Sequence, residues 1–456
     1  MAVPGEQNWL GSGEPPVPSR WWPWLYNAAL VGASPLIVGY LCYRLVVRGK
    51  SRAGLRQRLG GVPRLPPPPA AGRVWLQAVS AGEVAAAAPV ARWLRELSPE
   101  TEIVITTTTP AGQAQARRLI PWAAAHAYFP FDFWPCAAAA LARLQPTVIA
   151  SVETEIWPNW LSLARARGVP SLVLNGKFSD RGFRRARRVA PLYRWALGLP
   201  EGLLMQSEGD AERAVALGAP PSRVRVVGQT KFEQTIPAVS EAERAELRRA
   251  LGLPSEAPLL IAGSTHPGEE EQVVAAWEAA RQRVAELHLI VAPRHIERAE
   301  AVAAMLAARG YRVLRRRAGP PPADALDPQR TVWLLDTMGE LARLYALADV
   351  VFVAGSLAPI GGHDLLQPLF HGKPVLFGPY VQNQRDTAAL LLAAGAGFQV
   401  RDARELADAV VALLTDPGRA AAARTAGERL LAQHRGAARA CAEALLALAR
   451  KAARCP

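Results

Sequence analysis

The sequence predicts an α/β protein with two doubly wound, parallel-sheet domains and an apolar helix before them. Short apolar runs alternate with alanine-, arginine- and leucine-rich stretches of helical period, and this alternation is interrupted once. Strands that alternate with helices form parallel sheets with helices on both faces. The uncharged stretch 21–43 predicts the additional helix.

The stretch 21–43 reads WWPWLYNAALVGASPLIVGYLCY and is long enough to cross a bilayer as a helix. Its aromatic start is typical of a membrane interface, and the basic residues in 44–52 predict that the rest of the chain is cytoplasmic. We therefore predict a flexible N-terminus over 1–20 and a membrane anchor over 21–47. A buried core helix or an interfacial helix remains an alternative, because polar residues and a proline lie inside the stretch.

A basic segment with a proline run, residues 48–72, predicts a semi-rigid linker. A first α/β domain is predicted over 73–235. Its strands are expected at 74–79, 102–108, 147–153, 171–175, 203–207 and 224–228. Stretches of helical period, such as AAAAPVARWLREL, separate most of these runs.

The alternation stops at QTKFEQTIPAVSEAERAELRRALGLPSEAP, which contains prolines and a helix start with the Ser240–Glu243 capping spacing. This predicts an interdomain linker over 236–256, a second α/β domain over 257–435 and a C-terminal helix over 436–456. The strands of the second domain are expected at 258–263, 288–293, 311–315, 331–335, 349–355, 374–378 and 397–400. Two such domains place ligand sites at the carboxyl ends of the strands, facing a cleft.

The composition indicates which classes of binding partner the protein can have. The formal charge of +14 suits nucleic acid, an anionic membrane surface or phosphorylated substrates. No zinc-finger spacing or aromatic RNA-binding pattern is present, so we expect no nucleic-acid partner. The four cysteines are scattered and the histidines lack metal-ligand spacing, so neither a disulfide framework nor a metal site is expected.

Glu83, in QAVSAGEV, follows the first predicted strand and admits two interpretations. With Ser80 it has the S-x-x-E spacing of a capping box, in which the glutamate would bond a backbone N–H. A carboxylate in a turn at the edge of a sheet also suits a general base. The residues themselves do not decide between these two roles.

Polar clusters follow other predicted strands too. They are TTTTPAG, SVETEIWPN and NGKFSDRGFRRARR in the first domain, and GSTHPGEEE, PRHIER, DTMGEL and SLAPIGGHD in the second. Glycine-rich turns before helices leave backbone N–H groups free for phosphate, so several of them suggest a nucleotide. Each cluster also has a structural interpretation: threonines cap turns, an arginine run forms a solvated face, and the glutamates at 269–271 favour the first turn of a helix.

In this order, VSAGE, TTTTPAG, FPFD, ETEIWPN, GSTHPGEE, PRHIER, DTMGELARLYALADV, AGSLAPIGGHD and FGPYVQN resemble the Kdo (3-deoxy-D-manno-octulosonic acid) transferases of lipid A biosynthesis. The resemblance runs from about residue 24 to about residue 400. It implies a GT-B fold, with a Rossmann-like acceptor domain followed by a Rossmann-like nucleotide-sugar domain. It also implies an inverting enzyme at the inner membrane that faces the cytoplasm. Such an enzyme moves Kdo from CMP-Kdo to a lipid A precursor without a metal or a cofactor.

The resemblance assigns roles to residues. The general base falls on Glu83, and a second essential carboxylate on Glu153 or Glu155. The predicted donor and CMP contacts are Ser264, Thr265, Arg294, His295, Met338, Gly339, Glu340, Gly361, Gly362, His363 and Gln367. The predicted acceptor contacts are Ser80, Lys177, Arg184, Arg185, Arg187 and Arg188, with the arginines facing phosphates. A carboxylate held in its own cap is a poor base, so we expect Glu83 to face the cleft.

The sequence departs from the family pattern at two places. GGHDLLQ replaces the usual GGHNPLE, so Asp364 and Gln367 stand at altered positions. Lys177 replaces the usual arginine and cannot make the same bidentate contact. Two alternatives therefore stay open: a GT-B transferase with another nucleotide sugar or glycolipid acceptor, and an inactive membrane-anchored relative.

Overall fold

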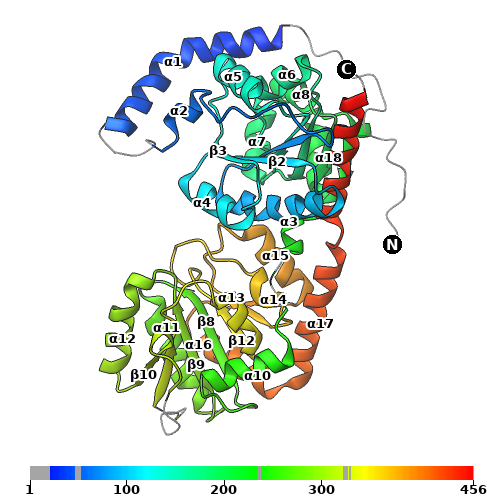
Figure 1. Cartoon of the computed structure of the whole chain (residues 1–456). Coiled ribbons are helices and arrows are strands. Elements are labelled where there is room, and N and C mark those ends of the chain that lie inside the picture. The colour runs from blue at the N-terminus through cyan, green and yellow to red at the C-terminus, as the bar shows by residue number, and fades with distance from the viewer. Residues whose placement is uncertain are drawn as a thin grey trace. The chain divides into compact units, whose positions relative to one another are not determined.

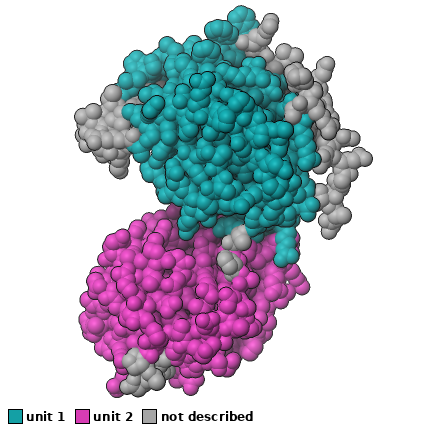
Figure 2. All heavy atoms as spheres, viewed as in Figure 1, with its two compact units in different colours: residues 1–234, 434–456 teal, residues 235–433 magenta. Residues whose placement is uncertain are grey.

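A computed structural model of the chain describes residues 21–46, 53–234, 236, 238–321, 327 and 330–454. The chain divides into two compact units: residues 1–234 with 434–456, and residues 235–433 (Figure 2). The expected flexible terminus, 1–20, lies outside the described residues. The expected linker at 236–256 belongs to the second unit, and the last residues of the chain return to the first.

Unit 1 is built on one fully parallel sheet, in which β2 and β3 are labelled in Figure 1. The strand order is β3-β2-β1-β4-β5-β6-β7. Its strands are β1 (Arg73–Gln77), β2 (Glu102–Thr107), β3 (Ala125–Tyr128), β4 (Val148–Val152), β5 (Ser171–Gly176), β6 (Gly202–Met205) and β7 (Val224–Val226). Strand β3 was not predicted. It is a short edge strand that contains a histidine and is buried only at alternate residues, so it lacks a continuous apolar run.

Helices cover both faces of this sheet. They are α2 (Leu55–Arg58), α3 (Ala81–Leu97), α4 (Pro110–Leu119), α5 (Trp134–Leu144), α6 (Pro158–Ala166), α7 (Asp180–Arg187), α8 (Ala190–Leu197), α9 (Glu208–Ala216) and α18 (Ala437–Arg454), with 3-10 turns η2 (Pro221–Arg223) and η3 (Thr230–Glu233). On one face, Val74 and Leu76 pack with α3 and α18. On the other, Trp75 packs with residues of α5 and α6. Successive residues in the centre of β1 thus point into different cores, which is why Val74, Trp75 and Leu76 are all apolar.

Unit 2 repeats the architecture with a second parallel sheet of order β10-β11-β9-β8-β12-β13-β14. Its strands are β8 (Leu259–Thr265), β9 (His288–Pro293), β10 (Arg312–Arg315), β11 (Thr331–Leu334), β12 (Val350–Val353), β13 (Val375–Phe377) and β14 (Gly397–Gln399). Its helices are α10 (Glu241–Ala250), α11 (Glu269–Arg281), α12 (Ala299–Ala308), α13 (Leu341–Leu344), α14 (Leu366–Leu369), α15 (Arg385–Ala394), α16 (Ala403–Thr415) and α17 (Pro417–Gln433), with 3-10 turns η4 (Ile296–Arg298), η5 (Arg316–Ala318) and η6 (Tyr345–Leu347).

The strand order of each sheet reverses direction at one point. In unit 1 this point lies between β1 and β4, where Gln77 is in register with Ser151. In unit 2 it lies between β8 and β12, where Gly263 is in register with Val353. Chain connections diverge at such points, which leaves a crevice beyond the carboxyl ends of the two strands, where ligands bind in open α/β sheets. The fold therefore marks the loops after β1, β4, β8 and β12.

Helix α1 (Trp22–Val46) covers most of the predicted anchor. No helix in the described part of the chain is both long and apolar enough to cross a membrane. One side of α1 packs on unit 1: Asn27 and Asn159 exchange side-chain hydrogen bonds, and Tyr26 donates to Asp132. Large apolar side chains elsewhere on the helix are exposed, among them Trp24 and Leu36, 76% and 80% exposed.

Candidate active site

The loop after β1 holds Glu83 in the first turn of α3. Ser80 is the N-cap residue, and its hydroxyl oxygen accepts from the Glu83 N–H. The Glu83 carboxylate accepts from the Val79 N–H at 2.7 Å and from the Ser80 hydroxyl at 3.0 Å. We expected this side chain to leave its own cap, and here it does not: Glu83 is 7% exposed and both its oxygens are bonded within the turn.

The loop after β4 carries two more carboxylates beside Glu83. Glu153 has a φ of +61°, in the left-handed region that a non-glycine residue rarely adopts. Its carboxylate lies between two ammonium groups, with Lys177 Nζ at 3.1 Å from one oxygen and Lys231 Nζ at 3.0 Å from the other. Glu155 is half-buried, and its carbonyl accepts from Ser151. The strained backbone of Glu153 is therefore accompanied by a fully paired side chain.

The two lysines lie in the segments that follow strands β5 and β7. Lys177 follows the end of β5, and Lys231 lies in turn η3, shortly after β7. Asn175, also in the left-handed region, accepts from the Thr230 N–H at 3.0 Å, and the Thr230 hydroxyl donates to Ala86 of α3. These bonds tie the η3 turn to β5 and to the helix that begins next to Glu83.

This arrangement gives Glu83, Glu153 and Glu155 different pKa values. Burial, and then the negative charge of Glu153, raise the pKa of Glu83 to about 7. Burial would also raise the pKa of Glu153, but Lys231 and Lys177 outweigh it and lower the pKa. Burial and Glu153 raise the pKa of Glu155. Carboxyl groups whose pKa values diverge in this way are typical of acid–base sites. The lowered pKa keeps Glu153 charged at neutral pH, whereas Glu83 can exchange a proton there.

Lys231 was not among the predicted site residues. Its segment, QTKFE, begins the stretch in which the predicted alternation of strands and helices stops, and it precedes the linker expected at 236–256. The sequence could have indicated Lys231, because this residue comes shortly after the last predicted strand of the first domain. The carboxyl ends of all strands in a parallel sheet lie at the same edge, where ligands bind.

In unit 2, Glu269 organises the loop after β12. Its side chain is fully buried and accepts hydrogen bonds from the N–H groups of Gly355, Ser356, Leu357 and Ala358, at 2.7 to 3.2 Å, and from that of His266. We expected the glycine-rich loop to offer free N–H groups to phosphate. The protein's own carboxylate instead occupies the groups at 355–358, and Glu269 does more than favour the first turn of α11.

Three imidazoles lie beside this loop. The Nε2 atoms of His266 and His363 are 2.8 Å apart, and the two rings are stacked with an interplanar angle of 4°. His295 packs edge-on against His266. Burial, followed by the charges of His266, Arg294 and His295, lowers the pKa of His363 to about 4. His266 was not predicted, although it follows β8 directly.

The other predicted donor contacts divide by their surroundings. Arg294 and His295 are exposed after β9 and lie close enough to His363 to act on it electrostatically. Thr265 is fully buried and its hydroxyl donates to Glu270, so this side chain holds α11 against the end of β8. The N–H groups of Gly361 and Gly362 donate to the Gly355 carbonyl, which removes them as phosphate donors here.

The other predicted donor contacts make no hydrogen bond to the three histidines among the bonds of the described residues. Ser264 has a φ of +62° at the end of β8. Met338 is 74% exposed and precedes Gly339, and Glu340 is ion-paired with Arg316 at 2.9 Å. Gln367 donates to Asp364 at 3.3 Å within the turn that begins α14.

The predicted acceptor arginines lie on α7, whose N-cap is Ser179, except for Arg188, which is its C-cap residue. All of them are exposed: Arg184, Arg185, Arg187 and Arg188. Among the residues that the structure describes, no group of three or more His, Cys, Asp or Glu side chains is arranged to hold a metal ion.

Comparison with solved structures defines the class of fold. The UDP-GlcNAc 2-epimerase of Neisseria meningitidis superposes with a TM-score of 0.55 at 12% identity, over 82% of this chain and 100% of that one. The glycosyltransferase of kitacinnamycin gives a TM-score of 0.51 at 16% identity, over 82% and 97%. These similarities show the fold, which is the paired α/β architecture of GT-B glycosyltransferases and their relatives.

Sequence comparison identifies the family. The model of the 3-deoxy-D-manno-octulosonic-acid transferase (kdotransferase) family matches residues 53–234. A 3-deoxy-D-manno-octulosonic acid transferase of Bordetella pertussis is 34% identical over 91% of this chain and 96% of its own length. The chain therefore belongs to the 3-deoxy-D-manno-octulosonic acid transferases and is a glycosyltransferase, as its motifs implied.

Proposed function

We propose that this enzyme transfers Kdo from CMP-Kdo to a hydroxyl group of a lipid A precursor, with Glu83 as the general base. The observation that carries the proposal is the position of Glu83 at the switch point of the first sheet, buried beside Glu153, with a pKa of about 7. A base with this pKa is half deprotonated at neutral pH and still accepts a proton readily.

In the proposed reaction, Glu83 removes the proton from the acceptor hydroxyl as its oxygen bonds to the anomeric carbon of Kdo. The bond from that carbon to the phosphate oxygen breaks on the opposite face, so the configuration inverts. The bonding electrons leave with CMP, and the proton stays on Glu83 until solvent removes it. Ser80 and the Val79 N–H orient the carboxylate, while Glu153, rather than Glu155, keeps a fixed negative charge nearby.

The donor contacts proposed in unit 2 are side chains. His295 and His363 belong to the histidine cluster and Arg294 lies beside it, and these three side chains would bind the phosphate of CMP. The amides at 355–358 are not included, because Glu269 occupies them. The four exposed arginines at 184–188 remain proposed contacts for the phosphates of the acceptor. Lys177, whose ammonium group pairs with Glu153, remains a proposed acceptor contact.

Helix α1 supplies the proposed attachment to the inner membrane. Its exposed tryptophan, leucine, valine and tyrosine side chains suit the interfacial region of a bilayer, whereas its other side is fixed to unit 1 through Tyr26 and Asn27. An interfacial helix held in this way would keep the transferase on the cytoplasmic surface, where it meets a lipid acceptor.

The substrates can be tested by measuring CMP release from CMP-Kdo with a tetra-acylated lipid A precursor. We expect release that depends on the acceptor, together with a product heavier by one or more Kdo residues. A parallel panel of other nucleotide sugars covers the alternative donor. Turnover of another donor but not of CMP-Kdo would contradict this assignment.

The pH dependence of the reaction should report Glu83. Only the deprotonated carboxylate accepts a proton, so kcat/KM for the acceptor should fall about tenfold per pH unit below about 7 and level off above it. Acceptor titrations between acid and mildly alkaline pH, at saturating donor, measure this profile. CMP affinity over the same range is the control, and a midpoint near the ordinary glutamate pKa of 4.5 would contradict the assignment.

Replacing Lys231 should move that midpoint. Lys231→Met removes a positive charge from Glu153, so the negative potential at Glu83 increases and its pKa rises further, by about half a unit to one unit. The acid limb of the kcat/KM profile should shift to higher pH by the same amount. Lys231→Arg keeps the charge and should shift it much less. Identical profiles for Lys231→Met and the parent enzyme would argue against electrostatic coupling.

A further inference from the structure

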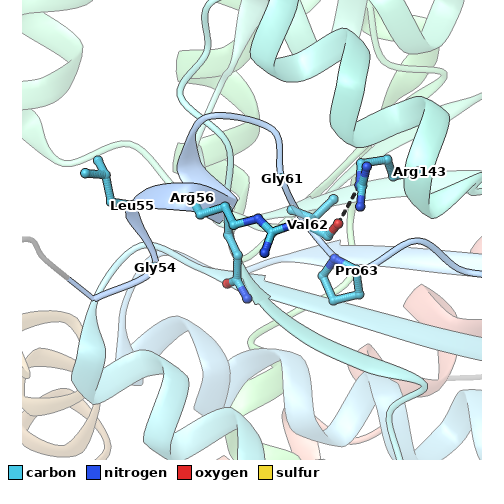
Figure 3. Close-up of a pocket in the computed structure, with 8 residues that line it drawn as sticks. Gly54, Leu55, Arg56, Gly61, Val62, Pro63 and Arg143 are labelled. Carbon is cyan, nitrogen blue, oxygen red and sulfur yellow. Dashed lines mark hydrogen bonds between the residues drawn. The ribbon is translucent and has the colours of Figure 1, made fainter.

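A surface pocket of unit 1 lies apart from the candidate active-site residues. It has a volume of about 440 Å³ and lies between helix α2, the segment Gly61–Pro63 and Arg143 of α5 (Figure 3). Among the described residues, its lining includes the side chains of Arg56 and Arg143 and no carboxylate. The pocket is therefore positively charged and large enough for a phosphate with an attached polar group.

The two arginines are arranged differently. Arg143 is half-buried, and its Nε donates to the Val62 carbonyl at 2.6 Å, which fixes the plane of the guanidinium. The terminal amino groups of Arg143 have no partner among the described residues. Arg56 is exposed, and Figure 3 shows its side chain extending from α2 toward Val62 and Pro63. One fixed and one adaptable guanidinium in the same pocket can bind an anion from two directions.

The surrounding turn is rigidly attached to the sheet. The Arg58 guanidinium lies over the Tyr128 ring and donates to the Thr108 carbonyl. The Gln57 side chain accepts from the Tyr128 N–H at 2.7 Å. Gly54 has a φ of +72°, and a side chain there would collide with Tyr128. These contacts hold the residues on either side of Arg56, so the pocket does not depend on Arg56 for its shape.

The pocket is also close to α1 along the chain. Helix α1 ends at Val46 and α2 begins at Leu55, so an extended connection spans at most about 30 Å. If α1 lies in the interfacial region of a bilayer, the pocket is within reach of the lipid headgroups. Guanidinium groups bind phosphate through paired N–H donors, and the absence of a lining carboxylate leaves this charge uncompensated within the pocket.

We propose that the Arg56–Arg143 pocket binds the phosphate of an anionic phospholipid headgroup while α1 lies on the same bilayer. This inference rests on the proposed membrane association of α1. It assigns the two arginines a role separate from catalysis: they give the enzyme a preference for anionic membranes and fix its rotation about α1.

The test compares two exposed arginines of the same segment. Full-length Arg56→Gln, which alters the pocket, and Arg64→Gln, which removes the same charge outside its lining, are bound to phosphatidylcholine vesicles with and without phosphatidylglycerol. We expect Arg56→Gln to weaken binding to the anionic vesicles at least tenfold, as lost charged hydrogen bonds require. Arg64→Gln should weaken it at most about fivefold, the contribution of one basic residue near such a surface.

A third variant tests the geometry. Arg143→Lys keeps the charge but removes the planar guanidinium, so binding to anionic vesicles should still fall severalfold. Because Arg143 contacts Val62, its thermal unfolding is checked first; if this variant is unstable, Arg56→Gln alone carries the test. Equal losses from Arg56→Gln and Arg64→Gln would reduce the effect to general surface charge and overturn the proposal.

Two further arms separate the remaining outcomes. Inorganic phosphate is titrated by calorimetry without vesicles; phosphate binding that Arg56→Gln abolishes, with vesicle binding unchanged, would assign the pocket to free phosphate and overturn the lipid proposal. Wild-type protein that binds neither kind of vesicle would refute the membrane association itself. Wild-type binding to both kinds with no effect of Arg56→Gln would refute only the pocket.

Discussion

Glu83→Gln is expected to lower kcat at least a hundredfold while CMP still binds. A glutamine amide cannot take the proton of the acceptor hydroxyl, and a positioned general base contributes about 10²- to 10⁴-fold to such reactions. The substitution keeps the size of the side chain and an oxygen that can accept from the Val79 N–H. Turnover with saturating CMP-Kdo and acceptor measures the loss, and CMP titration shows that the fold and the donor site persist.

The chain provides a matched control for the capping role of Glu83. Ser240 and Glu243 form a complete capping box at the start of α10, where Glu243 is partly exposed and also pairs with Arg343. Glutamine is tolerated at this position of a capping box, so Glu243→Gln should change stability by less than about 1 kcal/mol and leave kcat unchanged. If Glu83→Gln behaves in the same way, Glu83 is a cap and the proposed base is wrong.

Glu269→Gln is expected to lower the free energy of unfolding by about 3–5 kcal/mol and to weaken CMP binding at least tenfold. One carboxylate oxygen accepts from Ser356, Leu357 and Ala358, and the other from Gly355 and His266. In glutamine one of these oxygens becomes an NH₂ group that faces N–H donors. Several buried amides then lose their acceptor, and hydrogen bonds to charged groups contribute about 1.5–3 kcal/mol each.

Denaturant unfolding and CMP calorimetry measure both effects. Glu271→Gln is the matched control, since Glu271 lies in the same first turn of α11 but is exposed. It should change stability by less than about 0.5 kcal/mol. A Glu269→Gln protein that remains as stable as Glu271→Gln would contradict the structural role of the buried carboxylate. Normal stability with weak CMP binding would instead assign Glu269 to the ligand.

Most strands could be predicted because parallel sheets covered on both faces need continuous apolar runs. The run 288–293 became β9 with the same bounds, and 171–175 became β5 with one residue added. Strand β3 could not be predicted in this way, because an edge strand needs burial only at alternate residues and so has no continuous apolar run. The sequence also did not predict that α18 packs on the sheet of unit 1. This helix has an apolar face, but a periodic pattern does not reveal which sheet that face covers.

For the site, the sequence by itself determined the family and the motif residues at the strand ends, Glu83, Glu153 and His363 among them. Local patterns record which residues follow a strand, because that depends only on neighbours in the chain. Tertiary structure alone decided which strand ends meet. It brought Lys231 into contact with Glu153, which lies 78 positions earlier in the chain. It also buried Glu269 against the loop that begins at Gly355, 86 positions later. Such contacts depend on the strand order of the sheet, and no local spacing encodes that order.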